Sequence, residues 1–146
     1  MKRLTYLMLL MGMMLFVQPV ETQASDYLFD LCWTGSNSQG TDTFDLRLGI
    51  SSVGGGHYAL HGLIAKPEGL GAAVSGNLEM RADGSIVASL VWASKDDTRM
   101  WTRTMRLYFG SDLSAVYHKI GSDKEFGTAG QTNHYDQGTL TLTPCQ

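Results

Sequence analysis

Apolar and polar residues alternate with a period of two over most of this chain, which is the pattern of strands that bury one face. The alternation is densest in residues 74–109, which we interpret as three successive strands. Asp83-Gly84 separates the first two strands, and this dipeptide favours a tight hairpin because it adopts positive φ angles at low cost. A polar link at residues 93–98 separates the second strand from the third. The sequence therefore predicts a meander of hairpins.

Further strands are expected on both sides of this stretch. The cleanest alternation covers residues 43–50, where Phe44, Leu46, Leu48 and Ile50 share the inward face. The first strand is centred on residues 32–34, with residues 27–31 as its extension or as a plug across a barrel end; the remaining strands are expected at residues 57–65, 113–120 and 139–143.

Strands joined by short turns, with no helical periodicity after the N-terminal segment, indicate an all-β protein. We expect a single antiparallel up-and-down β-barrel of about eight strands, because closure removes the exposed edges of a sheet. A two-sheet β-sandwich is the alternative.

The N-terminal segment predicts export. Lys2 and Arg3 precede an apolar run at residues 4–17, and Thr22-Gln23-Ala24 offers small residues at the positions that a signal peptidase inspects. We expect a signal peptide at residues 1–24, a barrel domain at 25–146 and no transmembrane segment after cleavage. The expected location is the periplasm or the extracellular space.

Charge argues against nucleic acid as a partner. The chain of 146 residues has a formal net charge of −3, and removing Lys2, Arg3 and Glu21 with the signal peptide leaves 9 basic and 13 acidic residues, or −4. No run of basic residues is present to contact phosphates.

The two cysteines are expected to form a disulfide. Cys32 stands in the first strand and Cys145 is the penultimate residue, and an exported protein keeps its disulfides. Both have the outward parity of their strands, so the bond fits a last strand that lies antiparallel to the first. Free thiols are the alternative.

The usual signatures of catalysis and metal binding are missing from the sequence. His57 and His61 share a strand face but stand about 13 Å apart, too far to hold one ion. Asp96-Asp97 is not continued into a calcium-loop pattern. There is no nucleophile elbow, no phosphate-binding glycine loop and no zinc motif. We therefore predict no metal and no cofactor, and we favour a function other than catalysis.

Arg103 is the most informative charged residue. It has the same strand parity as Trp101, Met105, Leu107 and Phe109, so the pattern places a guanidinium on the inward face. A buried charge needs a partner or a ligand. A β-bulge that shifts the register, or burial of the opposite face, is the alternative.

Large aromatic residues gather on strands and at their ends. Trp33, Trp92, Trp101 and Tyr117 predict the walls of a cavity in the barrel mouth, with Arg103 contacting an anionic group of a small, partly apolar ligand. The competing account is that these side chains fill the barrel.

A different function remains open, namely a protein-interaction or inhibitor module that acts through its loops. The loops expected to act in this way are a long polar loop at residues 121–138 and the turn at 36–41.

These features resemble the avidin and streptavidin group, within the wider calycin class of eight-stranded, lipocalin-like barrels. The resemblance lies in Trp33-Thr34-Gly35-Ser36-Asn37, Leu90-Val91-Trp92, Met100-Trp101-Thr102, Tyr117 and Gly138-Thr139-Leu140-Thr141. It implies a ligand-binding barrel in which Asn37, as well as the aromatic residues, contacts the ligand. The chain departs from the family pattern at Ile64, Asp97, Arg99 and Gly138, and these departures argue against biotin as the ligand.

Overall fold

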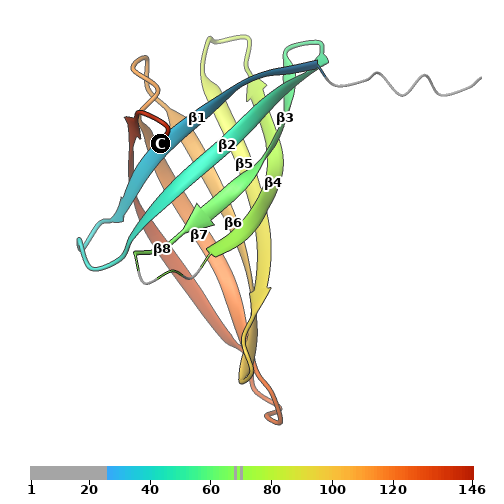
Figure 1. The fold of residues 1–146 in the computed structure, drawn as a ribbon, viewed down its shortest axis with the longest axis vertical. Helices are drawn as coiled ribbons and strands as arrows, with labels where there is room; N and C mark the ends of the chain where they lie inside the picture. The colour runs from blue at the N-terminus through green and yellow to red at the C-terminus, as the bar shows by residue number, and fades with distance from the viewer. Residues whose placement is uncertain (1–25, 68, 70) are drawn as a thin grey trace, which may run out of the picture.

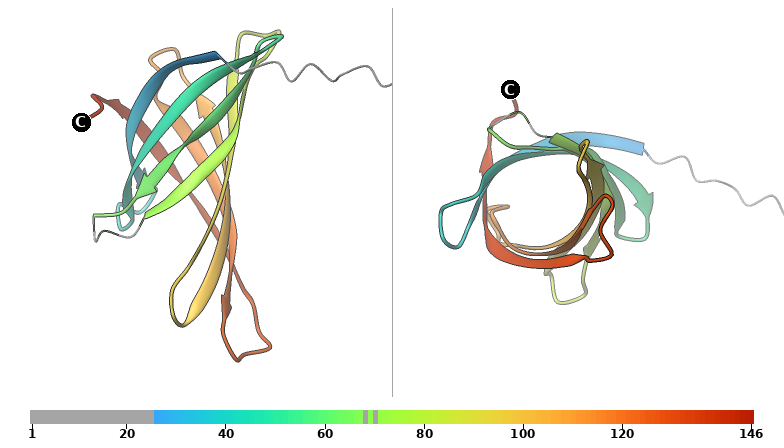
Figure 2. Two further views of the ribbon diagram at one scale, coloured as in Figure 1. Left: turned by 45° about the vertical axis from the view of Figure 1, so that its right-hand side comes forward. Right: turned by 90° about the horizontal axis from the view of Figure 1, so that it is seen from below.

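The structure, a computed structural model, describes residues 26–146 except 68 and 70, and these residues form one closed antiparallel barrel (Figure 1). Each strand pairs with its neighbours in the sequence, and the last pairs with the first, which confirms the predicted barrel and excludes the sandwich. The strands are β1 (Asp26–Asn37), β2 (Thr43–Gly54), β3 (His57–Ala65), β4 (Gly71–Met80), β5 (Ile86–Lys95), β6 (Arg99–Phe109), β7 (Ala115–Glu125) and β8 (Thr132–Thr143). Viewed from below, the strands form one continuous ring (Figure 2). No helix long and apolar enough to cross a membrane occurs in this described part of the chain.

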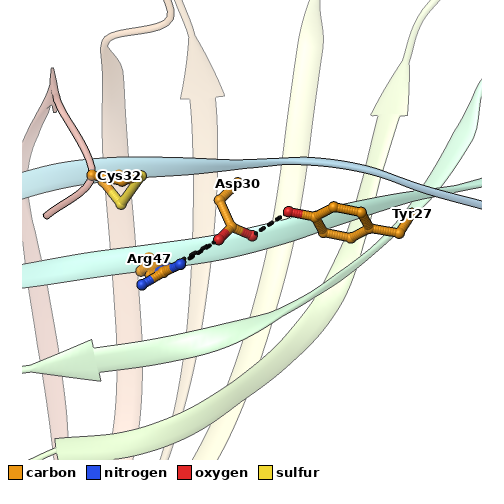
Figure 3. Close-up of a disulfide and its surroundings, with 5 residues drawn as sticks. Tyr27, Asp30, Cys32 and Arg47 are labelled. Carbon is orange, nitrogen blue, oxygen red and sulfur yellow. Dashed lines mark hydrogen bonds and ion pairs between the residues drawn. A yellow bond between two sulfur atoms is a disulfide. The ribbon is translucent and has the colours of Figure 1, made fainter.

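The barrel closes between β1 and β8, where a disulfide reinforces the joint. The register runs from Cys32↔Thr143 to Asn37↔Gly138, and the predicted bond between Cys32 and Cys145 is present. Figure 3 shows it on the outer surface, near Asp30 of β1, which pairs with Arg47 of β2 at 2.5 Å. The predicted signal peptide lies outside the described residues.

One end of the barrel is filled with side chains. Trp33 is 2% exposed, packs against the ring of Phe109 and donates a hydrogen bond from Nε1 to the carbonyl oxygen of Leu113 at 2.8 Å. The inward residues of β2 complete this core as the alternation predicted. The buried apolar residues are Trp33, Phe44, Leu46, Leu48, Ile50, Leu60, Val74, Val87, Ala88, Leu90, Met105, Leu107, Ala115, Tyr117 and Leu140.

Two inward glycines allow neighbouring strands to approach closely. A Cβ on Gly62 would lie 1.7 Å from the carbonyl oxygen of Arg47, and one on Gly76 would lie 2.0 Å from that of Ser89. A side chain at either position would displace backbone, so these glycines permit the strong curvature that a small barrel requires.

The predicted long loop at residues 121–138 is wrong. β7 continues to Glu125 and β8 starts at Thr132, so the connection is only residues 126–131. The error has a physical cause: inward positions of these strands near the barrel mouth carry charged side chains, so the apolar alternation stops while the strands continue. The seventh strand also starts at Ala115, two residues later than expected.

Four strands extend further than the others at the mouth. The β4–β5 ladder ends at Ser75↔Val91, and the β1–β8 ladder ends at Asn37↔Gly138. The β5–β6, β6–β7 and β7–β8 ladders continue beyond these points, and the backbone N–H of Phe126 bonds to the carbonyl oxygen of Thr98 at 2.8 Å between the two hairpin tips. Both hairpins project below the rest of the barrel (Figures 1 and 2). We call this four-stranded projection, formed by residues 92–104 and 119–137, the mouth wall.

Candidate functional site

A cavity of about 560 Å³ opens at the end of the barrel opposite Trp33. One side is the inner face of the mouth wall, and the other side comes from the start of β2 and the β3–β4 connection. The side chains that line it are mostly charged, with fewer uncharged polar and aromatic ones; they include Asn37, Gln39, Asp42, Phe44, Ile64, Lys66, Trp92, Ser94, Asp96, Arg99, Trp101, Arg103, Lys119, Asp123, His134, Tyr135 and Asp136.

Strand register explains how the lining changes with depth. Cross-strand partners form rows across β5, β6, β7 and β8, and the row just beneath the cavity is apolar: Ala88, Leu107, Tyr117 and Gly138. The next three rows, moving outward, are Leu90, Met105, Lys119 and Asp136; Trp92, Arg103, Gly121 and His134; and Ser94, Trp101, Asp123 and Thr132. Over only a few residues along each strand, the interior therefore changes from a packed core to a polar face that includes two indole rings.

Arg103 points inward, as its parity predicted, and the ladders on both sides of it show no bulge. Its Nη2 lies 2.6 Å from Oδ1 of Asp123, and both side chains are 18% exposed. This contact is an ion pair whose angle is poor for a hydrogen bond, so Oδ1 has no aligned donor among the described residues. Nη1 donates to the carbonyl oxygens of Thr102 and Ser122 at 2.9 and 3.2 Å.

Electrostatics around Asp123 favour the carboxylate form. Burial alone would raise the pKa of Asp123, but the nearby guanidinium of Arg103, followed by His134 and Arg99, holds it below its ordinary value. Nε2 of His134 lies 3.2 Å from Oδ2 of Asp123. Gly121 makes room for this arrangement, because a Cβ there would lie 2.3 Å from Cδ of Arg103.

A second charged cluster crosses the cavity floor. Nζ of Lys119 lies 2.9 Å from Asp136 and 3.5 Å from Asp42, and Asp42 also pairs with Lys66 at 2.7 Å. The ammonium of Lys119 stands 5.8 Å from the ring centre of Tyr117, whose hydroxyl donates to Asp136 at 3.3 Å. Burial, with the negative charge of Asp136, raises the pKa of Tyr117 well above its ordinary range, so this phenol stays protonated.

Two partly buried tryptophans face the cavity from adjacent strands. Trp92 pairs across the ladder with Arg103, and Trp101 pairs with Ser94, so the two tryptophans occupy diagonal positions on adjacent strands, a spacing of about 7–8 Å between such positions. The guanidinium of Arg99 lies 5.6 Å from the ring centre of Trp101. Asp96 fixes Arg99 by accepting from its backbone N–H at 2.8 Å, and hydrogen bonds chiefly from Thr98 lower the pKa of Asp96 to about 2.

The structure places the predicted site residues at different depths. Trp92, Trp101 and Arg103 line the cavity together. Tyr117 lies beneath it, fully buried against Phe44, whose ring centre is 5.5 Å away.

The other two predicted ligand-binding residues, Asn37 and Trp33, lie at the rim of the cavity and in the packed end of the barrel. Asn37 stands at the rim, where its side-chain oxygen accepts from the backbone N–H groups of Thr41 and Asp42 at 2.8 and 3.1 Å, so its amide organises the turn after β1. Trp33 lies in the packed opposite end and does not line the cavity.

Sequence reasoning missed the charged partners, namely Asp42, Lys66, Lys119, Asp123, His134 and Asp136. The signal that identifies most of them is strand parity. Lys119 and Asp123 continue the inward parity of Tyr117, and His134 and Asp136 continue that of Leu140. Extending these two strands through their polar halves would have found them.

The site is a polar, aromatic-lined cavity at one end of an otherwise filled eight-stranded barrel. Within the described ranges, no group of three or more His, Cys, Asp or Glu side chains is placed to hold a metal ion. His57 and His61 lie on the outer surface of β3, away from the cavity. Comparison of the chain with protein-family models, with curated proteins and with solved structures finds no match.

Proposed function

We propose that this barrel binds a small molecule in the open cavity at the mouth wall, with Trp92 and Trp101 as its main contact surfaces. The observation that carries the proposal is the contrast between the two ends of one barrel. The end around Trp33 is filled with apolar side chains, whereas the opposite end holds about 560 Å³ of open space. A barrel of eight strands is narrow enough for side chains to fill it, so an open, aromatic-lined end favours binding.

The role of Arg103 in this proposal follows from its surroundings. Asp123 already balances its charge at 2.6 Å. We therefore propose that Arg103 helps to shape the wall and offers hydrogen-bond donors to a ligand, without acting as a free counter-ion for an anionic group. The avidin-like resemblance is compatible with a ligand in this place.

Tryptophan fluorescence tests the proposal, because the tryptophans report on opposite ends. A small-molecule library is screened by thermal shift, where a ligand at about 100 times its Kd stabilises by about 2.7 kcal/mol. Hits are then titrated with Trp92→Phe, Trp101→Phe and the matched control Trp33→Phe. Binding weakened by the first two variants and kept by the third supports the proposal. Loss of binding in Trp33→Phe alone would contradict it.

The alternative, an interaction module that acts through loops, has less support. Its main determinant was the expected loop at residues 121–138, and only residues 126–131 connect the strands. The turn after β1 remains available on the surface. A barrel filled at both ends would have favoured this alternative.

We also infer that the protein is exported, with cleavage between Ala24 and Ser25. The support is the N-terminal sequence together with a disulfide, which persists in oxidising compartments. Intact mass of periplasmic or secreted protein should correspond to residues 25–146 less two hydrogens. A retained N-terminal segment, or two thiols that alkylate without reduction, would contradict the inference.

A further inference from the structure

We propose that the ligand of the mouth cavity is a neutral saccharide, recognised by stacking on Trp92 and Trp101 and by hydrogen bonds to the polar side chains between them. This inference rests on the proposed function and adds the chemical class of the ligand. Three properties of the cavity support it: its charge balance, the filling of the apolar interior beneath it, and the open edges of the mouth wall.

The lining has no excess of either charge. Four aspartates face Lys66, Arg99, Arg103 and Lys119, and each of these eight side chains has an opposite partner. The pairs are Lys66–Asp42, Lys119–Asp136, Arg103–Asp123 and Arg99–Asp96, at 2.7, 2.9, 2.6 and 3.5 Å. An anionic or cationic ligand would have to compete with a partner already present. A neutral ligand with several hydroxyl groups can instead share the donors and acceptors of intact pairs.

The apolar interior offers no channel for an acyl chain. Beside and below the charged floor, Leu90, Met105, Leu107, Tyr117 and Leu140 are all 0% exposed. The open volume is therefore confined to the polar rows near the mouth. A lipid would have to place its chain against charged groups, at a cost in desolvation.

The two indoles supply the apolar surface that such a polar cavity otherwise lacks. A sugar ring has one face of C–H groups, which suits the electron-rich face of an aromatic ring, and a rim of hydroxyl groups. The rows that contain Trp92 and Trp101 also contribute Ser94, Arg103 and Asp123. Stacking surfaces flanked by hydroxyl, guanidinium and carboxylate groups match both parts of a sugar.

The edges of the mouth wall leave space for a ligand longer than one ring. The β4–β5 ladder stops at Val91, so residues 92–95 have no β4 partner, and the β1–β8 ladder stops at Gly138. The cavity is consequently a trough that is open along the sides of the wall. A chain of sugars can lie across the indoles and continue out of the trough.

The test begins with the disulfide-bonded protein, purified in its exported form, on an array of neutral and acidic glycans. The best neutral oligosaccharide is then titrated by calorimetry beside oligogalacturonate of equal length, palmitate, biotin and adenosine. We expect a neutral glycan to bind, with an affinity that changes less than about twofold between about 0.05 M and 0.5 M NaCl. Trp92→Ala and Trp101→Ala should each weaken binding about tenfold or more, and Trp33→Phe should leave it unchanged. The variants Trp92→Phe and Trp101→Phe keep an aromatic ring, and circular dichroism measures folding. Together they show whether weaker binding by the alanine variants comes from lost stacking or from lost folding.

The remaining outcomes distinguish the two proposals. Binding of only oligogalacturonate, palmitate, biotin or adenosine through the mouth tryptophans would overturn the saccharide inference and leave the proposed function standing. A neutral glycan whose affinity is the same in all tryptophan variants binds elsewhere and overturns the inference as well. If neither the array nor the library yields a ligand dependent on Trp92 or Trp101, both proposals fail.

Discussion

Replacing Arg103 with methionine should destabilise the protein by an amount that depends on pH. The substitution keeps a long side chain over Gly121 but removes the charge 2.6 Å from Asp123. Exposed ion pairs contribute about 0–1 kcal/mol, whereas removing one partner of a fully buried pair costs about 3–5 kcal/mol. With both side chains 18% exposed, we expect a loss of about 2 kcal/mol near pH 7.

The direction of the pH dependence follows from the two pKa values of Asp123. In the native protein its pKa lies below the ordinary value, so its contribution to stability is present above about pH 4 and is lost as pH falls through the lowered pKa. Without Arg103, burial dominates and raises the pKa of Asp123. The charged form then opposes folding at neutral pH, and protonation relieves this penalty as pH falls. The difference in unfolding free energy between the two proteins should therefore shrink between about pH 7 and pH 3.

Urea unfolding at several pH values measures this difference. The double variant Arg103→Met, Asp123→Leu is the matched control, because replacing both partners leaves no unpaired charge and should cost less than about 1 kcal/mol. Repeating the series with His134→Gln isolates the contribution of the histidine that lies 3.2 Å from Asp123. A single-variant cost below about 0.5 kcal/mol at neutral pH, or one independent of pH, would refute the reasoning.

Three other changes test separate parts of the structure. Replacing Cys32 and Cys145 with alanine opens a link spanning 113 residues and should lower the free energy of unfolding by up to about 4–5 kcal/mol in urea melts; a loss below about 1 kcal/mol would contradict this. Gly121→Ala places a Cβ 2.3 Å from Cδ of Arg103, so it should destabilise by about 1–3 kcal/mol; because Arg103 is displaced from Asp123, this loss should also shrink as pH falls, and an unchanged melt would contradict the close approach described at Gly121. Trp33→Phe removes a buried N–H donor and ring volume and should cost about 1–3 kcal/mol; a variant as stable as the native protein would contradict the packing described for that end.

Sequence reasoning worked where the interior is apolar. Phe44, Leu46 and Leu48 alternate with polar residues, and all three are buried. At the hairpin, Gly84 has the predicted positive φ, +81°, whereas Asp83 does not. The disulfide was also predictable, because two outward cysteines near the chain ends meet when the last strand pairs with the first.

The reasoning failed where inward positions become polar. Lys119, Asp123 and Asp136 face the cavity from strands, but a run of such residues has the composition of a loop. Hydrophobic alternation detects a strand only while one face is buried against apolar atoms. The end of the chain's seventh strand and the start of its eighth were therefore hidden by the same residues that form the site.

The position of a residue along the barrel axis was a second property that the sequence did not predict. Parity places Trp33, Trp92 and Trp101 on the inside, yet it does not say which end each one occupies. That depends on the stagger between strands, which is fixed by the closing register Cys32↔Thr143 and by the curvature at inward glycines. One tryptophan thus belongs to the core and two belong to the mouth, although all three have inward parity on their strands.

The separation of core and mouth has a consequence for how binding can be altered. β5 and β6 hold the fully buried Leu90 and Leu107 in their inner rows and Trp92 and Trp101 in the next two rows outward. Cavity-forming changes in the packed rows cost several kcal/mol, whereas the mouth tryptophans are only partly buried and already border open space. Selectivity should therefore respond to substitutions at Trp92, Ser94 and Trp101 with little loss of stability. Two charge pairs are the exception: Arg103–Asp123 and Lys119–Asp136 each link two strands of the wall, so removing one member weakens the pairing of a partly buried charge.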